Sequence, residues 1–259
     1  MPFDDMRAGR GILTGMVRIL CLALVTAASL AAQPVLSAVE KRMVEAVEAQ
    51  GESGERLLEE FVNQNSGTFH PAGVRAVAGM MDRELRALGF TTRLIPLEQI
   101  GRGVHLVAER NVGAGQRPVL LIGHLDTVLQ PSSPFQKLER RGRTAVGPGT
   151  SDMKGGLVVM VTALRAMREA GTLDGIPLTV FLTGDEEAPG DIAVSRREFI
   201  AAGKAARAAL CFETGIRTVT QDMVSTARRG FTAWELRVTG ETGHSSGIFS
   251  EGKGYGAVF

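Results

Sequence analysis

Carboxylate and imidazole side chains, which can bind metal ions or transfer protons, stand in four short clusters along the chain. In sequence order the clusters are His124 with Asp126, Asp152, Glu186 with Glu187, and Glu213. Each cluster by itself has an ordinary explanation, such as a helix cap, a solvated loop or a hydrogen-bonded histidine. Gathered in one place, however, they would repel one another unless cations neutralised their charge. If the fold brings them together, the sequence predicts a metal site.

Apolar runs of strand length carry three of these clusters. Residues 118–122, 177–182 and 208–212 are largely apolar, as is typical of strands buried on both faces of a sheet. A cluster follows the carboxyl end of each run, and Asp152 precedes the apolar helical segment 155–170. In open α/β sheets, ligands bind beside the carboxyl ends of the strands. We therefore expect one rim of a sheet to collect all four clusters.

The remaining pattern indicates an α/β fold. Apolar residues at helical spacing, together with helix end signals, occur before and between the strands. Further helices are expected at residues 37–50, 55–63, 71–88 and in a short segment that ends at 199–204, and further strands at 91–97 and 104–109. Strands that alternate with helices predict a mostly parallel sheet sandwiched by helices.

The pattern changes near Phe231, which suggests a second domain. Residues 231–239 alternate, with Trp234, Leu236 and Val238 on one face, as in a half-buried antiparallel strand. One strand cannot bury its own apolar face, so we expect the chain to be truncated inside this domain. The predicted organisation is a signal peptide at 1–36, an incomplete catalytic metal-binding domain at 37–225 and the beginning of a second domain at 226–259.

The N-terminal residues have the features of a secretory signal peptide. Arg7, Arg10 and Arg18 precede the apolar run 19–32, which is too short to span a bilayer. We therefore expect a periplasmic or secreted protein without a stable membrane anchor. Removal of residues 1–36 would leave Cys211 as the single cysteine, so the mature chain could form no intrachain disulfide.

Composition adds little to this picture but excludes some partners. The formal net charge of the 259 residues is +1, and 5% of them are aromatic. Binding to nucleic acid or to a membrane surface needs a concentrated basic patch, and base stacking needs aromatic side chains. We therefore expect no nucleic-acid partner.

Five motifs, in order and in register, resemble a known enzyme family. They are GHLDTV at 123–128, GPGTSDMKGG at 147–156, GDEE at 184–187, FE at 212–213 and TGETGHSS at 239–246. This pattern is similar to that of the co-catalytic di-zinc metallopeptidases, which include glutamate carboxypeptidase, acetylornithine deacetylase, succinyl-diaminopimelate desuccinylase and aminoacylase-1. The resemblance covers about residues 37–259 and is strongest to the glutamate carboxypeptidase branch. It implies a zinc exopeptidase-like catalytic domain with an inserted α+β lid.

The resemblance also implies a metal centre with two Zn²⁺ ions, for which Co²⁺ or Mn²⁺ could substitute. One ion would be bound by His124, Asp152 and Glu213, and the other by Asp152, as a bridging ligand, and Glu187. The family supplies one further histidine ligand after the lid. The histidines of this chain are His70, His105, His124 and His244, and none of them matches that position.

Three further residues receive roles from the resemblance. Asp126 would orient the ring of His124, and Glu186 would be the general base for a metal-bridging water. His244 would stabilise the developing oxyanion in the active site of a partner subunit, because the lid forms a homodimer in the family. The implied substrate is a small peptide or N-acyl amino acid, cleaved next to a free carboxylate.

Two other interpretations of the function remain open at this point. Residues 243–247 fit the G-x-S-x-G pattern of serine hydrolases, but no histidine follows them and no buried strand precedes them. A chain without its last metal ligand could instead be an inactive fragment or a pseudoenzyme that binds metal without turnover.

Overall fold

The structure is a computed structural model that describes residues 35–142, 144–218, 220, 222–227, 230, 234–237 and 239. Almost all of the predicted signal peptide and His244 lie outside these residues. The chain divides into two compact units after Thr214. The predicted domain boundary between residues 225 and 226 lies further along the chain and stays a prediction. Among the described residues, no helix is both long and apolar enough to cross a membrane.

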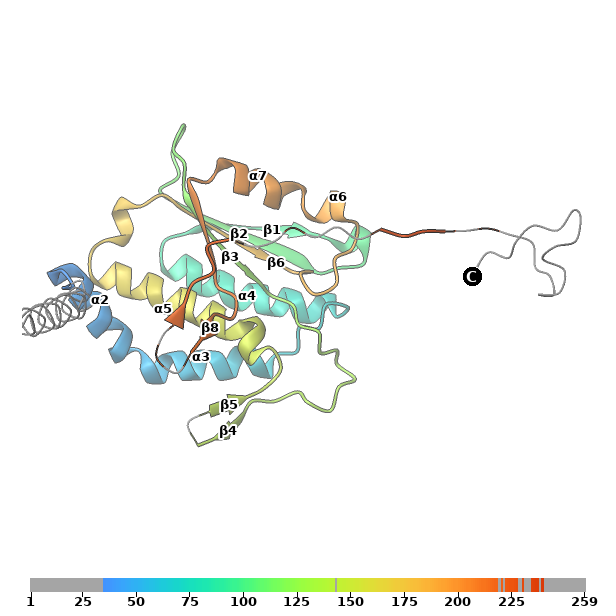
Figure 1. Ribbon diagram of the computed structural model, residues 1–259, viewed down its shortest axis with the longest axis horizontal. Helices are drawn as coiled ribbons and strands as arrows, with labels where there is room; N and C mark the ends of the chain where they lie inside the picture. The colour runs from blue at the N-terminus through green and yellow to red at the C-terminus, as the bar shows by residue number, and fades with distance from the viewer. Residues whose placement is uncertain are drawn as a thin grey trace, which may run out of the picture. The chain divides into compact units, whose positions relative to one another are not determined.

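A five-stranded sheet forms the centre of the first unit (Figure 1). Its strands, in spatial order, are β1 (Thr91–Pro96), β2 (Val104–Arg110), β6 (Leu178–Thr183), β3 (Val119–His124) and β7 (Ala208–Cys211). Strands β6, β3 and β7 are parallel, whereas β2 is antiparallel to both of its neighbours. The sheet is therefore mixed, with β2 alone running against the other four strands.

Helices cover both faces of this sheet, so the predicted α/β fold class is confirmed. The helices are α2 (Ala38–Ala49), α3 (Gly51–Asn63), α4 (Pro71–Ala87), α5 (Gly155–Glu169), α6 (Ile192–Ser195) and α7 (Arg197–Ala205). Short helical turns are η1 (Glu98–Ile100), η2 (Thr150–Lys154) and η3 (Leu173–Gly175). Gly89 and Gly171 follow α4 and α5 with φ of 82° and 74°, the left-handed conformation that commonly ends a helix.

Two hairpins complete the described elements. In the first unit, β4 (Glu139–Arg141) pairs with β5 (Thr144–Val146), and the sequence pattern did not predict this hairpin. In the second unit, β8 (Ile216–Arg217) pairs with β9 (Asp222–Met223).

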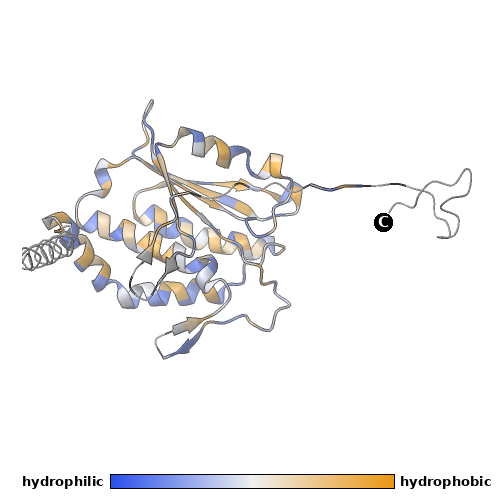
Figure 2. Cartoon of the chain, viewed as in Figure 1, coloured by the Kyte–Doolittle hydropathy of each residue, from blue (hydrophilic) through white to orange (hydrophobic). Residues whose placement is uncertain are grey.

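The core has a large layer and a small layer on opposite faces of the sheet. On one face, α3, α4 and α5 contribute Phe61, Met81 and Met160 to a large buried cluster. On the other face, Phe181 of β6 packs against Phe199 of α7. Figure 1 shows α4 and α5 below the sheet and α6 and α7 above it, and Figure 2 shows the hydrophobic colour of the strands between them. All six residues of β6 are buried, and burial on both faces suits its apolar residues on each side of the sheet.

Two expectations about the last strands need correction. Residues 208–211 form a strand as predicted, but all four are exposed, and Leu210 is 53% exposed. The prediction that this strand is buried was wrong because β7 is an edge of the described sheet, and an apolar run does not encode its position in a sheet. Within the predicted strand 231–239, residues 234–237 adopt no strand and Trp234 is 80% exposed. The other residues of that segment, except Thr239, lie outside the described residues.

Candidate metal centre

The parallel strands bring the predicted ligands to one rim of the sheet. His124 is the last residue of β3, the acidic pair Glu186 and Glu187 follows β6, and Glu213 follows β7. The η2 turn places Asp152 at the start of α5, where the Asp152–Met153 peptide bond is cis. A side chain on Gly156 would overlap the backbone oxygen of Phe212, so glycine permits this close approach of α5 to the end of β7.

Four of the predicted ligands are close enough to share metal ions. The Nε2 atom of His124 lies 2.9 Å from Asp152 Oδ1 and 3.3 Å from Glu213 Oε1. His124, Asp152 and Glu187 each offer one ligand atom, and these three atoms lie within 4.8 Å of one another. In a tetrahedral site, atoms that are each about 2.0–2.2 Å from one zinc ion lie about 3.3–3.6 Å apart, which is close to the separations of His124 from Asp152 and Glu213. The nitrogen and oxygen donors therefore fit Zn²⁺ or a similar divalent ion.

The pKa values of these side chains are shifted, because several carboxylates lie close together and partly buried. Burial lowers the pKa of His124, but hydrogen bonds to Asp126 and Glu213 outweigh it and raise the pKa to about 11. Burial and the nearby carboxylate of Asp152 raise the pKa of Glu187 to about 7. Burial also raises the pKa of Glu186. A divalent cation would favour the ionised carboxylates and the deprotonated imidazole, which is a second reason to place a metal here.

Asp126 lies beside His124, as expected, and also contacts the acidic pair. The Nδ1 atom of His124 is 3.0 Å from the backbone oxygen of Asp126 and 3.5 Å from its carboxylate oxygen Oδ1. The same carboxylate accepts hydrogen bonds from Thr68 Oγ1 at 2.6 Å, Glu186 N at 3.0 Å and Glu187 N at 3.1 Å. The sequence did not predict these three bonds, because the partners are 58 to 61 residues away.

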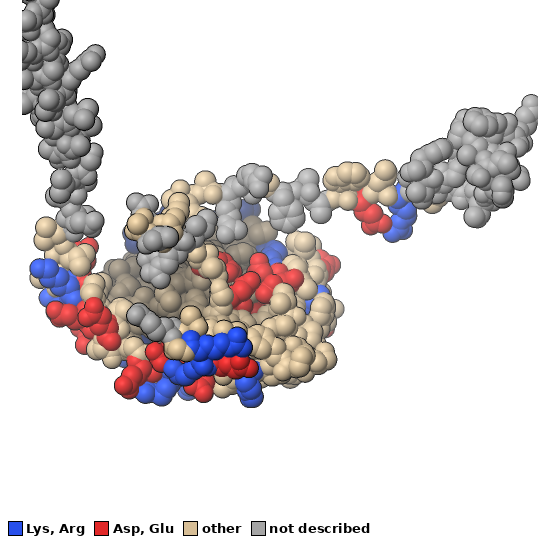
Figure 3. Space-filling view, turned by 60° about the horizontal axis from the view of Figure 1, so that its bottom comes forward, with Lys and Arg blue, Asp and Glu red and all other residues tan. Residues whose placement is uncertain are grey.

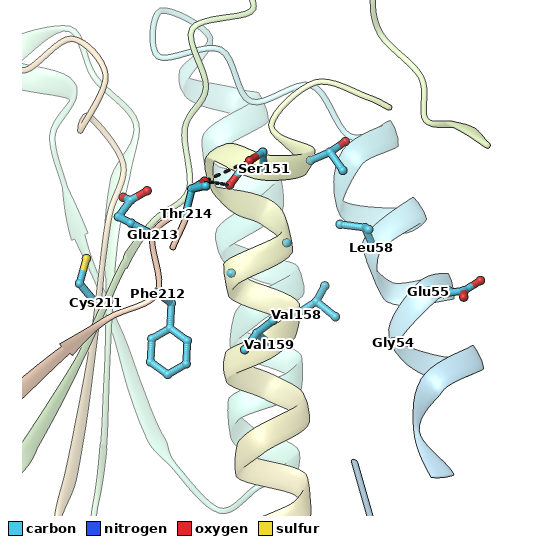
Figure 4. Close-up of a pocket in the computed structure, with 13 residues that line it drawn as sticks. Gly54, Glu55, Leu58, Ser151, Val158, Val159, Cys211, Phe212, Glu213 and Thr214 are labelled. Carbon is cyan, nitrogen blue, oxygen red and sulfur yellow. Dashed lines mark hydrogen bonds between the residues drawn. The ribbon is translucent and has the colours of Figure 1, made fainter. Parts of the chain in front are cut away.

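A largely apolar cavity of about 600 Å³ adjoins the ligands along α5 (Figure 4). Val158 and Val159 line it from α5, and Leu58 lines it from α3. Glu213 also lines the cavity, whereas His124 does not, so the metal ligands lie at its edge. Ser151 and Thr214 are linked by a hydroxyl–hydroxyl contact of 3.0 Å (Figure 4). The cavity could therefore receive an apolar group next to the predicted metal centre.

The surface charge is mixed rather than concentrated in one sign. Figure 3 shows lysine and arginine side chains interleaved with acidic ones along the lower rim of one face, and further acidic side chains inside a hollow. Exposed ion pairs of the described residues include Arg140 with Glu55 and Arg83 with Glu60.

The sequence motifs missed residues that shape the site without carrying its predicted chemistry. Thr68 contacts Asp126 and lies outside every motif. His105 is 1% exposed inside a strand, and a histidine in an apolar strand was the signal that could have identified it. Asp185 stands inside the GDEE motif but received no role from it, and it is fully buried next to the acidic pair. His244, to which the resemblance gave a role, lies outside the described residues.

Comparison with known proteins supports the predicted family resemblance. Residues 120–238 match the profile described as peptidase family M20/M25/M40. Carboxypeptidase G2 of Pseudomonas sp. (strain RS-16) is 30% identical over 194 residues, which are 73% of this chain and 45% of that protein. Succinyl-diaminopimelate desuccinylase of Leptothrix cholodnii is 31% identical over 199 residues, which are 73% of this chain and 50% of that protein. The chain is therefore similar to peptidase family M20/M25/M40 through residues 120–238, and the predicted resemblance is confirmed.

A solved structure supports the fold. Human carnosine dipeptidase 1 superposes with a TM-score of 0.55 at 17% identity, over 66% of this chain and 40% of that chain. At this level of identity the similarity shows the fold alone. The chain spans about half the length of the curated relatives it matches.

Proposed function

We propose that this protein is a zinc-dependent exopeptidase or amidohydrolase that cleaves a peptide or N-acyl amide bond next to a free carboxylate. The convergence of His124, Asp152 and Glu187, with Glu213 beside them, carries this proposal. The names of the relatives denote a carboxypeptidase and a desuccinylase, and both activities break an amide C–N bond. A small peptide or an N-acyl amino acid such as an N-acyl glutamate is the substrate class that fits both.

We assign His124, Asp152 and Glu213 to one Zn²⁺ ion, and Asp152 and Glu187 to a second. Co²⁺ or Mn²⁺ could replace zinc, since oxygen-rich sites discriminate poorly between these ions. A bound divalent ion would polarise the carbonyl of the scissile bond and lower the pKa of a water molecule. The ring orientation of His124 would depend on Asp126, which lies against the other ring nitrogen.

Glu186 is the residue that we assign to proton transfer. Burial raises the pKa of its carboxyl group, which brings it nearer to the value suited to a general base. Its backbone N–H donates a hydrogen bond to the Asp126 carboxylate at 3.0 Å, which fixes the point from which its side chain extends. The carboxylate would accept a proton from the attacking water and donate it to the leaving amine.

The proposal extends to the whole protein in two respects. Residues 1–36 would direct it to the periplasm or to the outside of the cell, as the apolar run 19–32 after three arginines suggests. The second domain would form a homodimer, through which His244 would reach the active site of the partner subunit. Both statements rest on the sequence and its family resemblance.

Zinc content and hydrolysis together test the proposal. The purified chain is dialysed and its zinc per chain measured by elemental analysis, beside Asp152→Ala, Glu186→Gln and the control Asp174→Ala. Asp174 is an exposed carboxylate of η3 and should not affect zinc. We expect the wild type and Glu186→Gln to retain zinc and Asp152→Ala to lose it. Hydrolysis of N-acyl glutamates and of peptides with C-terminal glutamate should be lost in Glu186→Gln.

Other outcomes have distinct meanings. Loss of zinc in Glu186→Gln but not in Glu187→Gln would show that the two roles have been exchanged. Zinc binding by a wild-type chain that hydrolyses none of these substrates would support the alternative, a protein that binds metal without turnover. A folded wild-type chain that retains no zinc would contradict the proposed metal centre.

A further inference from the structure

The acidic pair Glu186 and Glu187 stands on a short segment, residues 184–187, that is held mainly by its backbone. Asp126 accepts hydrogen bonds from the backbone N–H groups of both glutamates, at 3.0 Å and 3.1 Å. Among the residues that the structure describes, neither glutamate makes a hydrogen bond through its carboxylate. Their carboxylates are thus available to ligands, while their positions depend on what fixes the backbone of the segment.

His105 holds the first residue of the segment. In the antiparallel register of β2 and β6, Leu106 lies opposite Leu182, which carries His105 to the end of β6. The Nδ1 atom of His105 accepts a hydrogen bond from Gly184 N at 3.0 Å, and Nε2 donates to the backbone oxygen of Ser195 at 2.9 Å. These partners require a neutral ring with its proton on Nε2. Burial lowers the pKa of His105, which favours the same neutral form.

Asp185 is the second residue of the segment, and its buried side chain holds it in place. Its Oδ1 accepts hydrogen bonds from Arg196 Nη1 at 2.6 Å and Ser195 Oγ at 2.9 Å. Its Oδ2 accepts one from Gly190 N at 3.3 Å, and its backbone oxygen accepts one from Arg196 Nη2 at 3.2 Å. Asp185 is fully buried, and the guanidinium of Arg196 donates both to its carboxylate and to its backbone oxygen, so Asp185 has little freedom to move.

We infer that four residues position the carboxylates of the acidic pair: His105, Asp185, Ser195 and Arg196, here called the Asp185 clamp. The clamp fixes residues 184 and 185, and Asp126 fixes the two residues that follow. The inference rests on the proposed function, since it takes Glu187 as a ligand and Glu186 as a base. Functional side chains work only within about 0.5 Å of their productive positions, so a looser clamp should weaken metal binding without any change of ligand.

Titration of the full chain with Co²⁺, followed by visible absorption, tests this inference. His105→Leu removes both hydrogen bonds of the ring. Arg196→Lys keeps the positive charge but removes the guanidinium that contacts both the carboxylate and the backbone oxygen of Asp185. Arg197→Lys is the matched control, because Arg197 is the exposed neighbour at the start of α7. We expect the first two variants to bind Co²⁺ about 10- to 100-fold more weakly, with altered absorption bands, and the control to match the wild type.

A pair of polar variants separates hydrogen bonding from packing. His105→Asn keeps an acceptor near the position of Nδ1 for Gly184 N, whereas His105→Gln keeps a donor near Nε2 for the oxygen of Ser195. We expect His105→Asn to bind Co²⁺ more tightly than His105→Gln, because the bond to Gly184 acts on the segment directly. This comparison also decides the matter if His105→Leu does not fold, which circular dichroism would show.

The inference is overturned if folded His105→Leu and Arg196→Lys bind Co²⁺ within about twofold of the wild type with the same spectrum. Equal affinities for His105→Asn and His105→Gln would also contradict the role of Gly184. A wild-type chain that binds no Co²⁺ would contradict the proposed function itself, and the inference with it. Wild-type binding that is indifferent to the clamp would contradict the inference alone.

Discussion

Replacement of Asp126 by asparagine should cost this chain more stability than a change of one atom suggests. The Asp126 carboxylate is 1% exposed and accepts three hydrogen bonds, two from backbone N–H groups of the acidic pair and one from the hydroxyl of Thr68. Asparagine has one oxygen in place of two, so at least one backbone N–H group would face the N–H₂ group of the amide. That donor would then be buried without an acceptor.

The size of the loss follows from these contacts. A hydrogen bond to a charged group contributes about 1.5–3 kcal/mol, and one to a neutral group about 0.5–1.5 kcal/mol. Asp126→Asn would lose one bond of the first kind and convert the other two to the second kind, offset by the easier burial of a neutral amide. We therefore expect the free energy of unfolding to fall by about 2–4 kcal/mol.

Urea unfolding in the presence of a chelator would measure this loss without any contribution from bound metal. Asp174→Asn is the matched control, because Asp174 is an exposed carboxylate paired with Arg110 at the surface. An exposed ion pair contributes about 0–1 kcal/mol, so the control should change little. If Asp126→Asn costs no more than Asp174→Asn, the hydrogen bonds of Asp126 do not hold the acidic pair as the structure indicates.

Two further predictions concern backbone packing and pH. Gly156→Ala should destabilise the chain, because the added methyl group would overlap the backbone oxygen of Phe212. Gly79→Ala, in the exposed middle of α4, should instead stabilise the chain by about 0.5–1 kcal/mol. Thermal unfolding of both variants would check this, and equal effects would contradict the close approach at Gly156. Burial lowers the pKa of His105 below its ordinary 6.5, so His105 becomes protonated at a higher pH in the unfolded chain than in the folded chain. The free energy of unfolding should therefore fall as the pH drops below about 6.5. In His105→Gln that pH dependence should be smaller, and an unchanged slope between wild type and variant would refute the assignment.

Local sequence was sufficient to predict most of the fold and the candidate ligands. The apolar runs before His124 and Glu186 became β3 and β6, and the glycines after α4 and α5 ended those helices. Each ligand cluster directly follows a strand or opens a helix, so its position needs only the general rule that parallel strands end at a common rim. The local features therefore predicted where His124, Asp152, Glu187 and Glu213 would meet.

Other features depended on contacts that no local pattern encodes. The apolar composition of β7 resembles that of β6, yet β6 is buried and β7 is exposed, because one lies between two strands and the other at an edge. The order of strands in the sheet decides this difference. Similarly, β2 was predicted as a strand, but only the assembled sheet shows that it runs against its neighbours.

The sequence by itself determined which residues could bind metal, since ligand chemistry belongs to the side chains and their places at strand ends. The tertiary structure alone decided what holds those residues in position. His105 is 79 residues from Gly184, and Asp126 is 60 residues from Glu186. A shift of one residue in the pairing of β2 with β6 would turn His105 to the opposite face of the sheet. The support of the acidic pair therefore depends on strand register, which is set by the packing of the whole domain.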